Sequence, residues 1–415
     1  MARYQDEAEA YMARTYNSII NRRKFLTWCA AFGTGVVTTQ LTSCNSPSAT
    51  NTGAGSPTSS TSSSPIASGA VTGKGAVLPV TIPMAELVAK AKAEGKLRAY
   101  AMPPDWANWE GCFNLMESKY GVKATYKPEG ALSSGEAIQK YLAEANNPVG
   151  DIADVGIVFG SEAKTKGAIA AYKNSRWADI PDNLKDTEGF WASPYGGVLS
   201  FGVNPEKAKS VPKTWKELVS GSYPNMVAIN GDPRQSNSAL LAVISAAYAN
   251  GGSIDQIEKG IQLFADLKKA GNFTPAKADT AGLLSGEVGI AIKPDFLNLT
   301  DKDKFAGKPV IEVVIPSDGA VGTNYVQAIN RLAPNPYAAR LFQEFLYSDE
   351  GQLEMLKGYV RPTLISKLTI PAALQAKLPS PDQYKNVVPS ITDQSKLDAA
   401  KKIVQEKWGP MVLGQ

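Results

Sequence analysis

The sequence predicts an α/β protein made of two doubly wound units, each a parallel sheet covered by helices. Helix-like and strand-like segments alternate from Val80 onward, which is the pattern of parallel strands joined by crossover helices. Hydrophobic residues make up 43% of the 415-residue chain, which is enough for large cores. About 335 residues follow a low-complexity tract at 45–76, and at roughly 100 to 200 residues per domain this length predicts two domains.

The first block of alternation begins with a helix. Its apolar residues have helical spacing from Met84, and Gly95 ends the segment. A second helical pattern ends in the same way at Gly121, because glycine after the last helical residue is a common stop signal. The expected elements are helix 84–95, strand 96–102, helix 106–120, strand 122–126, helix 134–145 and strand 154–159.

The second block resumes the alternation and then returns to helices. No short-period internal repeat accompanies it. Two arrangements fit the two blocks: independent domains in series, or two lobes between which the chain crosses twice. The expected elements are strand 226–230, helices 238–248 and 254–269, strands 288–292, 310–316 and 324–329, and helices 336–347 and 349–357.

The N-terminal residues resemble an export signal. The run 22–26 (RRKFL) resembles a twin-arginine signal, and 41–44 (LTSC) resembles the lipobox of bacterial lipoproteins. We therefore expect residues 1–43 to be a signal peptide and Cys44 to be lipidated. A transmembrane helix is the alternative, but 27–42 is 16 residues long and a bilayer needs ~20 apolar residues.

A low-complexity tract follows Cys44. Within 45–76, Ile66 and Val71 are the only hydrophobic side chains larger than alanine, and Ser, Thr, Gly and Pro dominate. Such a composition cannot bury enough apolar surface to fold. We expect residues 44–78 to be a flexible tether. It would join a globular body to a lipid at the outer face of the cytoplasmic membrane, in the periplasm or on the cell surface.

The composition excludes several classes of enzyme site. The chain contains no histidine, which excludes a Ser-His-Asp triad, a Cys-His dyad and a His-ligated zinc. Cys29 leaves with the signal and Cys44 would carry lipid, so Cys112 remains alone and no mature disulfide is possible. We expect Cys112 to be a small buried hydrophobe rather than a reactive thiol. Removal of 1–43 leaves a net charge of +2, which does not indicate nucleic-acid binding.

Two segments in the middle of the chain resemble a known family. Residues 191–205 (WASPYGGVLSFGVNP) and 211–218 (VPKTWKEL) resemble the lobe-crossing strand and following helix of ABC-importer solute-binding proteins. This family includes polyamine, phosphonate and ferric-ion binders, and the resemblance covers about 97–364. It implies a type II periplasmic-binding fold in which crossover strands join lobe I, 79–204 and 323–415, to lobe II, 205–322. Lobe I would then contain both ends of the chain.

Candidate ligand residues in lobe I follow two strands, because ligands of open parallel sheets bind beyond the carboxyl ends of the strands. The two indoles could form a ligand wall, and a carboxylate beside them could pair with a cation. Packing of the indoles and capping of helices by Asp105 and Ser161 would explain the same residues. The candidates are Asp105, Trp106, Trp109, Phe159, Gly160 and Ser161.

Lobe II contains the clearest candidate site, the loop 230–238 between a strand and a helix. Backbone N–H groups, serine hydroxyls and an arginine together suit a phosphonate or carboxylate, while an ordinary capping loop is the alternative. The candidates here are Arg234, Gln235, Ser236, Asn237 and Ser238. Across the cleft and on the crossovers we add Lys293, Asp295, Tyr195, Asn324 and Tyr325.

The solute is open among small charged molecules. Aromatic residues with carboxylates suit a polyamine, whereas Arg234, Lys293 and the serines suit an anion, so a zwitterion or small organic phosphonate ranks first. A polyamine or a ferric chelate is the alternative. Ferric binders of the family use adjacent tyrosines, and the corresponding 292–298 (IKPDFLN) lacks them.

The resemblance implies the component of an ABC importer that captures a solute between its lobes and delivers it to membrane permease subunits. We expect a monomer without catalysis, cofactor or metal, whose lobes close about the crossovers near 196–204 and 317–325. A surface-anchored enzyme with a Cys or Lys nucleophile and a cell-surface adhesion protein are the rival classes. The missing histidines argue against the first, and the convergent loops argue against the second.

Overall fold

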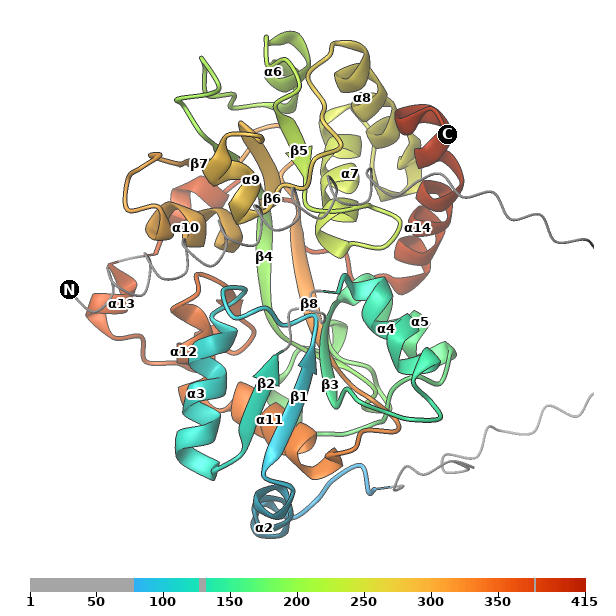
Figure 1. The fold of residues 1–415 in the computed structure, drawn as a ribbon, viewed down its shortest axis with the longest axis vertical. Helices are drawn as coiled ribbons and strands as arrows, with labels where there is room; N and C mark the ends of the chain where they lie inside the picture. The colour runs from blue at the N-terminus through green and yellow to red at the C-terminus, as the bar shows by residue number, and fades with distance from the viewer. Residues whose placement is uncertain (1–77, 127–131, 377) are drawn as a thin grey trace, which may run out of the picture. The chain divides into compact units, whose positions relative to one another are not determined.

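The computed structural model describes residues 78–126, 132–376 and 378–415, which form a nine-stranded mixed sheet with helices around it (Figure 1). The strand order is β2-β1-β3-β8-β4-β6-β5, and β7 and β9 also pair with β4. The strands are β1 Lys96–Tyr100, β2 Lys123–Tyr126, β3 Ile152–Gly156, β4 Ala192–Val203, β5 Val227–Ile229, β6 Ile290–Pro294, β7 Glu312–Val314, β8 Gly322–Ile329 and β9 Arg361–Pro362.

The helices divide between two lobes. We use lobe I for the part built on β1, β2 and β3, and lobe II for the part built on β5, β6 and β7. Lobe I contains α2 Met84–Glu94, α3 Trp109–Tyr120, α4 Ser134–Ala143, α5 Gly160–Thr165, α11 Pro336–Tyr347, α12 Asp349–Leu356 and α13 Ala372–Gln375. Lobe II contains α6 Trp215–Ser220, α7 Asn237–Ala249, α8 Glu258–Lys269, α9 Thr280–Ser285 and α10 Asp295–Lys304. The last helix, α14 Gln394–Trp408, is described below.

The direction of the strands confirms the predicted α/β class with two lobes joined by crossover strands. β1 pairs in parallel with β2 and β3, and β5 pairs in parallel with β6. The two long strands between the lobes, β4 and β8, are antiparallel to each other and to their other neighbours. The two strands run in opposite directions because β4 carries the chain from lobe I to lobe II and β8 brings it back. The alternative arrangement, two independent domains in series, is therefore wrong.

Most predicted elements are present, with shifted ends. Helix 106–120 was predicted one turn too long, because α3 begins at Trp109. Ala107 and Asn108 have φ values of 51° and 57°, and this left-handed backbone cannot continue a right-handed helix. The predicted helix 254–269 is a 3₁₀ turn, Ile254–Gln256, followed by α8.

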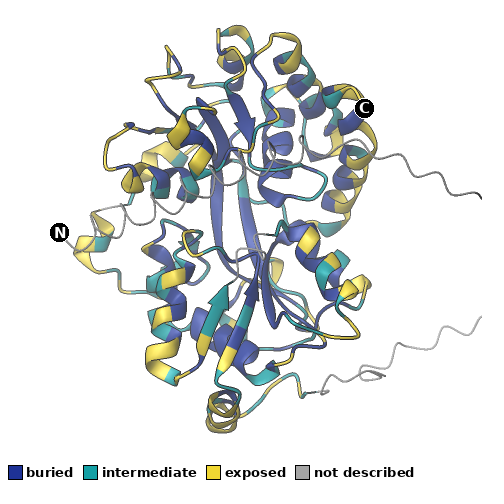
Figure 2. Ribbon diagram, in the orientation of Figure 1, coloured by how far each residue is buried: buried dark blue, intermediate teal, exposed yellow. Residues whose placement is uncertain are grey.

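The cores lie on both faces of the sheet. Every residue of β4 is buried, and Figure 2 shows the central strands buried while the outer faces of the helices are exposed. In lobe I, Trp109 and Phe113 pack against Phe342 of α11. In lobe II, Trp215 packs against Phe264. No helix in the described residues is long and apolar enough to cross a membrane.

The C-terminal segment makes a third passage between the lobes. After α13 the chain runs beside the crossover, where Val388 N–H donates to Ala320 O and Gly322 N–H donates to Val388 O. α14 then packs on α8, although the predicted lobe I range of 323–415 includes it. It also reaches lobe I, since Lys401 pairs with Glu162. The residue ranges predicted for the two lobes stay a prediction, since α14 contacts α8 of lobe II and Glu162 of lobe I.

We expect α14 to contribute strongly to stability. Trp408 is 2% exposed and its ring lies 5.2 Å from that of Phe264 and 6.2 Å from that of Phe273. Trp408→Ala should lower the free energy of unfolding by about 3 to 5 kcal/mol, because it leaves a cavity in the lobe II core. Chemical denaturation measures the change. Met411→Ala, at a side chain that is 38% exposed, is the control, and equal losses in both variants would contradict the packing argument.

Candidate functional site

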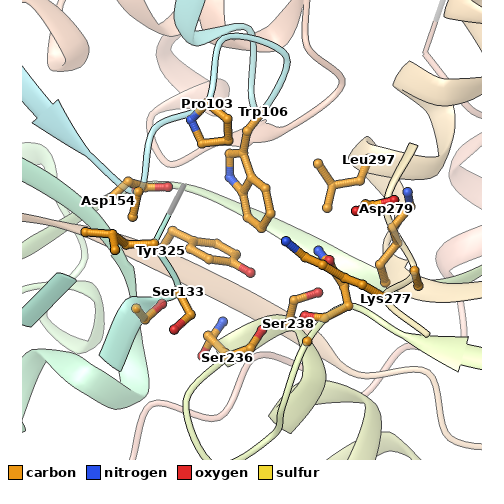
Figure 3. A pocket seen from close by; sticks show the side chains of 18 of the residues that line it. Pro103, Trp106, Ser133, Asp154, Ser236, Ser238, Lys277, Asp279, Leu297 and Tyr325 are labelled. Atoms are coloured by element: carbon orange, nitrogen blue, oxygen red, sulfur yellow. Dashed lines mark hydrogen bonds between the residues drawn. The ribbon is translucent and has the colours of Figure 1, made fainter. Parts of the chain in front are cut away.

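A cavity of about 630 Å³ lies between the lobes (Figure 3). Its size falls in the range of roughly 300 to 1,000 Å³ that is usual for small-molecule sites. Loops that follow β1 and β5 line it, together with the first residues of α4 and side chains of β3, β6 and β8. The position agrees with the rule that ligands bind beyond the carboxyl ends of parallel strands.

Half of the predicted ligand residues line this cavity. Those from lobe I and the returning crossover come from the loop after β1 and from β8. Those from lobe II come from the start of α7 and from β6. They are Asp105, Trp106, Gln235, Ser236, Asn237, Ser238, Lys293 and Tyr325.

The other predicted residues do not line the cavity, and their contacts explain why. Trp109 is fully buried in the lobe I core. The guanidinium of Arg234 pairs with Asp232 at 2.6 Å, which turns the strongest predicted anion ligand to a neighbour in its own loop. The ammonium of Lys401 lies over the ring of Phe159, at 3.8 Å from the ring centroid, and a Cβ atom at Gly160 would lie 3.0 Å from the indole of Trp191. Ser161 also lies outside the lining.

Three more predicted residues hold the crossovers together behind the cavity. The buried Asp295 carboxylate accepts from Val198 N–H of β4 at 2.9 Å and pairs with Arg361 at 2.9 Å. Asn324 donates to the hydroxyl of Ser193 at 3.1 Å. Tyr195 is fully buried and does not line the cavity itself, but its hydroxyl forms hydrogen bonds with two lining residues, Trp106 and Asp154. These side chains connect β4, β8 and β9 rather than facing the cavity.

The start of α7 presents hydrogen-bond donors to the cavity. The Ser236 hydroxyl caps the helix, since it accepts from Ala239 N–H at 3.3 Å and donates to Asn230 O at 2.7 Å. The first N–H groups of a helix have no partner within it, and the helix dipole adds partial positive charge there. Ser238 is 2% exposed, and within the described residues its hydroxyl oxygen has no hydrogen-bond partner. The Tyr325 hydroxyl, 3% exposed, makes no hydrogen bond of normal geometry in the described part of the chain, although the side chains of Asn237 and Ser238 beside it oppose the rise in its pKa that burial causes.

The start of α4 faces α7 across the cavity. The carboxylate of Glu136, in the first turn of α4, accepts hydrogen bonds from the backbone N–H and the hydroxyl of Ser133, both at 2.7 Å. These bonds form a capping box. Gly135 N–H donates to Gln235 O at 3.1 Å, so the two lobes touch at this rim. The predicted helix 134–145 begins at the observed residue, and the pattern S-x-x-E at 133–136 is typical of such a start. The sequence interpretation did not include it in the site.

Other lining residues were also missed. Lys277 and Asp279 lie on the loop that leads into α9, Thr280 is the first residue of that helix, and Asp301 lies inside α10. Asp154 lies inside β3 rather than after it. A search restricted to loops directly after strands passes over these positions, because only the folded chain brings them to the cavity.

A buried ion pair forms the floor on the lobe II side. Lys293 and Asp301 are each 2% exposed, and their charged atoms lie 2.5 Å apart. The hydroxyl of Thr280 donates to the other oxygen of Asp301 at 2.6 Å. Lys277 is exposed at the rim and forms no ion pair with any residue that the structure describes. The cavity therefore offers Lys277 as a cation that a ligand can reach.

A chain of hydrogen bonds connects the lining of lobe I. The indole N–H of Trp106 donates to the Tyr195 hydroxyl at 2.7 Å, and that hydroxyl donates to Asp154 at 2.6 Å. The amide of Gln327 donates to the other oxygen of Asp154 at 2.8 Å. Burial raises the pKa of the Asp154 carboxyl well above its usual range, and these two hydrogen bonds oppose the shift. The Tyr195 and Tyr325 rings stack at 5.4 Å.

Two further sequence predictions concern thiol and metal chemistry. Cys112 is fully buried in the lobe I core, and burial raises the pKa of its thiol well above the usual range. This placement agrees with the predicted small hydrophobe. Among the residues that the structure describes, no group of three or more His, Cys, Asp or Glu side chains lies close enough to hold a metal ion.

We expect Lys293 and Asp301 to depend on each other. Lys293→Met should lower the free energy of unfolding by about 3 to 5 kcal/mol, because it leaves a buried carboxylate without its cation. Lys293→Met combined with Asp301→Asn should lose less than Lys293→Met alone, since the amide that replaces the carboxylate is neutral and can still accept from Thr280. Denaturant titration of both variants and of Asp301→Asn checks this coupling. Losses that simply add would contradict it.

Comparison with known proteins gives consistent results. A family model described as "Bacterial extracellular solute-binding protein" matches residues 147–387. A putative 2-aminoethylphosphonate-binding periplasmic protein of Salmonella typhimurium is 22% identical over 282 residues, which cover 66% of this chain and 76% of that protein.

Solved structures share the fold. The periplasmic binding protein AfuA from Actinobacillus pleuropneumoniae, with exogenous fructose-6-phosphate bound, aligns with a TM-score of 0.62 and 22% identity over 77% of this chain and 98% of that chain. Iron-bound HitA from Pseudomonas aeruginosa aligns with a TM-score of 0.58 and 18% identity, covering 76% of this chain and 99% of that chain.

Proposed function

Because this chain belongs to the bacterial extracellular solute-binding proteins, the solute-capturing components of ABC importers, we propose that its solute is a small zwitterion or phosphonate-like molecule. Proteins of this kind bind small solutes and work with permease subunits of the membrane. They are binding proteins rather than enzymes, and we extend this property to the present chain. The relative named for 2-aminoethylphosphonate makes that molecule the first probe.

The unpartnered hydroxyls beside the start of α7 carry this proposal. Ser238 and Tyr325 are almost fully buried and line the cavity, and within the described residues neither hydroxyl makes a hydrogen bond of normal geometry, although the two side chains lie near each other. A buried polar group without a partner costs about 1 to 3 kcal/mol, so a ligand atom at this place recovers that energy. The positive end of the α7 dipole favours an anionic atom there.

Charges of both signs in the lining favour a zwitterion over a simple anion. Two lysines line the cavity with six acidic side chains, which are Asp105, Glu136, Asp154, Asp232, Asp279 and Asp301. Three of them pair with Lys304, Arg234 and Lys293, and the others would repel a simple anion, whereas a solute with a cationic group gains from them. A polyamine would leave the donors of α7 and Lys277 without an acceptor, and for this reason we rank it lower.

Contacts between the lobes surround the cavity, and we propose that they form when the lobes close on the solute. Lys304 of α10 pairs with Asp105 at 2.7 Å, and the hydroxyl of Tyr359 donates to Asp303 at 2.5 Å. Gly135 and Gln235 meet at the opposite rim. Each of these contacts joins lobe I to lobe II, and a solute that touches both lobes favours the state in which they are made. β4 and β8 are the proposed hinge.

Export and anchoring remain proposals as well. The predicted signal peptide 1–43, the lipidated Cys44 and all but the last residue of the tether 44–78 lie outside the described residues. The periplasmic relative supports export of this chain, and 41–44 (LTSC) supports a lipid anchor at the outer face of the membrane. We also propose that the protein acts as a monomer.

Ser238→Ala tests the proposed site. It should weaken binding of 2-aminoethylphosphonate by about 10-fold or more, because a hydrogen bond to a charged group is worth roughly 1.5 to 3 kcal/mol. Isothermal titration calorimetry measures the affinity, with spermidine as the polyamine probe.

Ser220→Ala is the matched control for that experiment. This serine ends α6, donates to Lys216 O and does not line the cavity, so the affinity should not change. Tight binding of spermidine together with no binding of the phosphonate would reject a zwitterionic or phosphonate-like solute in favour of a polyamine.

Cys44→Ala tests the anchor in the full-length chain expressed in a bacterium. The variant should move from the membrane fraction to the soluble exported fraction, because it lacks the thiol that carries the lipid. Immunoblots of the two fractions measure the change, and Cys112→Ala should stay with the membrane. A Cys44→Ala protein that remains in the membrane fraction argues instead for a spanning helix or another anchor.

A further inference from the structure

We propose that Asp154 is the counter-charge for a cationic group of the solute, so that this one carboxylate makes the cavity select solutes that carry an amine. This role rests on the proposed solute class, and it assigns recognition of the solute's cationic group to Asp154. Neither the resemblance of the sequence nor the comparisons assign a role to this position.

The first argument is the place of Asp154 in the cavity. It lies on β3 of lobe I and is 3% exposed, yet it belongs to the lining. Figure 3 shows its carboxylate on the side of the cavity opposite Lys277, with Ser236 and Ser238 in the lower part of the view. The lining carboxylate that is buried without a cationic partner therefore belongs to lobe I, and the serine donors at the start of α7 belong to lobe II.

The second argument is that the partners of Asp154 are neutral. Tyr195 and Gln327 donate to its two oxygens, and it forms no ion pair within the described residues. The other buried acid of the lining, Asp301, has a lysine at 2.5 Å. Asp105 and Asp232 pair with Lys304 and Arg234. Glu136 and Asp279 also form no ion pair among the described residues, but they are not buried and they accept hydrogen bonds at the starts of α4 and α9. A buried carboxylate without a cation is costly, and the open cavity is where a cation can reach it.

The third argument is the aromatic surface beside this carboxylate. The rings of Trp106 and Tyr325 meet edge to face at 5.2 Å, and both line the cavity next to Asp154. Figure 3 shows Tyr325 beside Asp154 and the indole of Trp106 in the middle of the view. Aromatic faces attract ammonium groups by about 0.5 to 2 kcal/mol. A carboxylate flanked by such faces therefore suits an alkylammonium better than a hydrated metal ion or a hydroxyl group.

Protonation gives the proposal a second signature. The titratable groups that face Asp154 are Tyr195 of β4, Tyr325 of β8 and Tyr347 of α11. Among the described residues, no Lys or Arg side chain acts on the pKa of Asp154. Burial raises the pKa of Asp154 in the empty protein. An ammonium beside it favours the ionised form. Binding of an amine should therefore release a proton, and affinity should rise as the pH increases through the pKa of the empty site.

A purely positional role for Asp154 makes a different prediction. Through Tyr195 it also holds the indole of Trp106. If that were its whole role, every solute that touches Trp106 would lose affinity equally when Asp154 is changed. A pair of ligands that differ only in the amine separates the two roles.

The test compares the binding of 2-aminoethylphosphonate with that of ethylphosphonate by isothermal titration calorimetry. Both ligands are titrated into the unmodified full chain and into its Asp154→Asn variant. The amide that replaces the carboxylate still accepts from Tyr195, and rotation of the Gln327 amide offers its unpartnered Oε1 to the new NH₂ group. We expect the unmodified protein to prefer the amine by about tenfold or more, and Asp154→Asn to lose most of that preference while it binds ethylphosphonate as before. Asp398→Asn, an exposed carboxylate on α14, should change neither affinity.

The same titrations at several pH values, in buffers of different ionisation enthalpy, measure the proton release. The ammonium of 2-aminoethylphosphonate lowers the second pKa of its phosphonate relative to that of ethylphosphonate, so each ligand is compared with itself in the unmodified protein and in Asp154→Asn, and the difference isolates Asp154. Equal affinity of the unmodified protein for both ligands overturns the inference and leaves the proposed solute class intact. An equal loss for both ligands in Asp154→Asn assigns the residue to positioning of Trp106 and also overturns it. Binding of neither ligand rejects the solute class and the inference together. If Asp154→Asn fails to fold, equal affinity of the unmodified protein for the two ligands still overturns the inference.

Discussion

The antiparallel pairing of β4 with β8 is the constraint on which the site depends. These strands run side by side between the lobes, with Gly196 opposite Asn324 and Tyr195 opposite Tyr325. A Cβ atom at Gly196 would lie 2.7 Å from Thr323 O, so the close approach requires glycine at this position. β8 continues into lobe I beside β3 and β4 continues into lobe II beside β6. The pairing thus brings Asp154 and Tyr325 of one lobe to the same cavity as Lys293 of the other.

The fold could be predicted from the sequence wherever local pattern and long-range packing agree. Alternating helices and strands gave the α/β class, and residues 191–205 and 211–218 gave the crossover that periodicity alone left open. The errors lie where backbone conformation or distant contacts decide. The left-handed backbone at Ala107 and Asn108 delays α3. The position of α14 on α8 depends on Trp408 entering the core of lobe II, and such a contact leaves no local signal in the helix.

The site could be predicted in its location but only partly in its residues. Loops after strands led to Trp106 and to the start of α7, and both line the cavity. Arg234 does not line it, because Asp232 two residues earlier holds its guanidinium, and the sequence shows the charge but not which partner it has. Asp154 lies within a strand that reads as an apolar run. Its exposure to the cavity follows from the pairing of β3 with β8, which no single segment reveals.

The distribution of unsatisfied groups gives the two lobes complementary tasks. Lobe II offers donors at α7 and a rim lysine, Lys277, while lobe I offers a carboxylate whose protein partners, among the described residues, are neutral. A solute with charges at both ends would then meet the full set of partners only when both lobes surround it. A solute can shift a conformational equilibrium only by the difference in its affinity for the two states. Separation of the two charged sites onto different lobes makes that difference large, since each lobe alone recognises half of the molecule. A solute with one charge would gain from one lobe and so would stabilise closure less, which links selection of the cargo to the closed form.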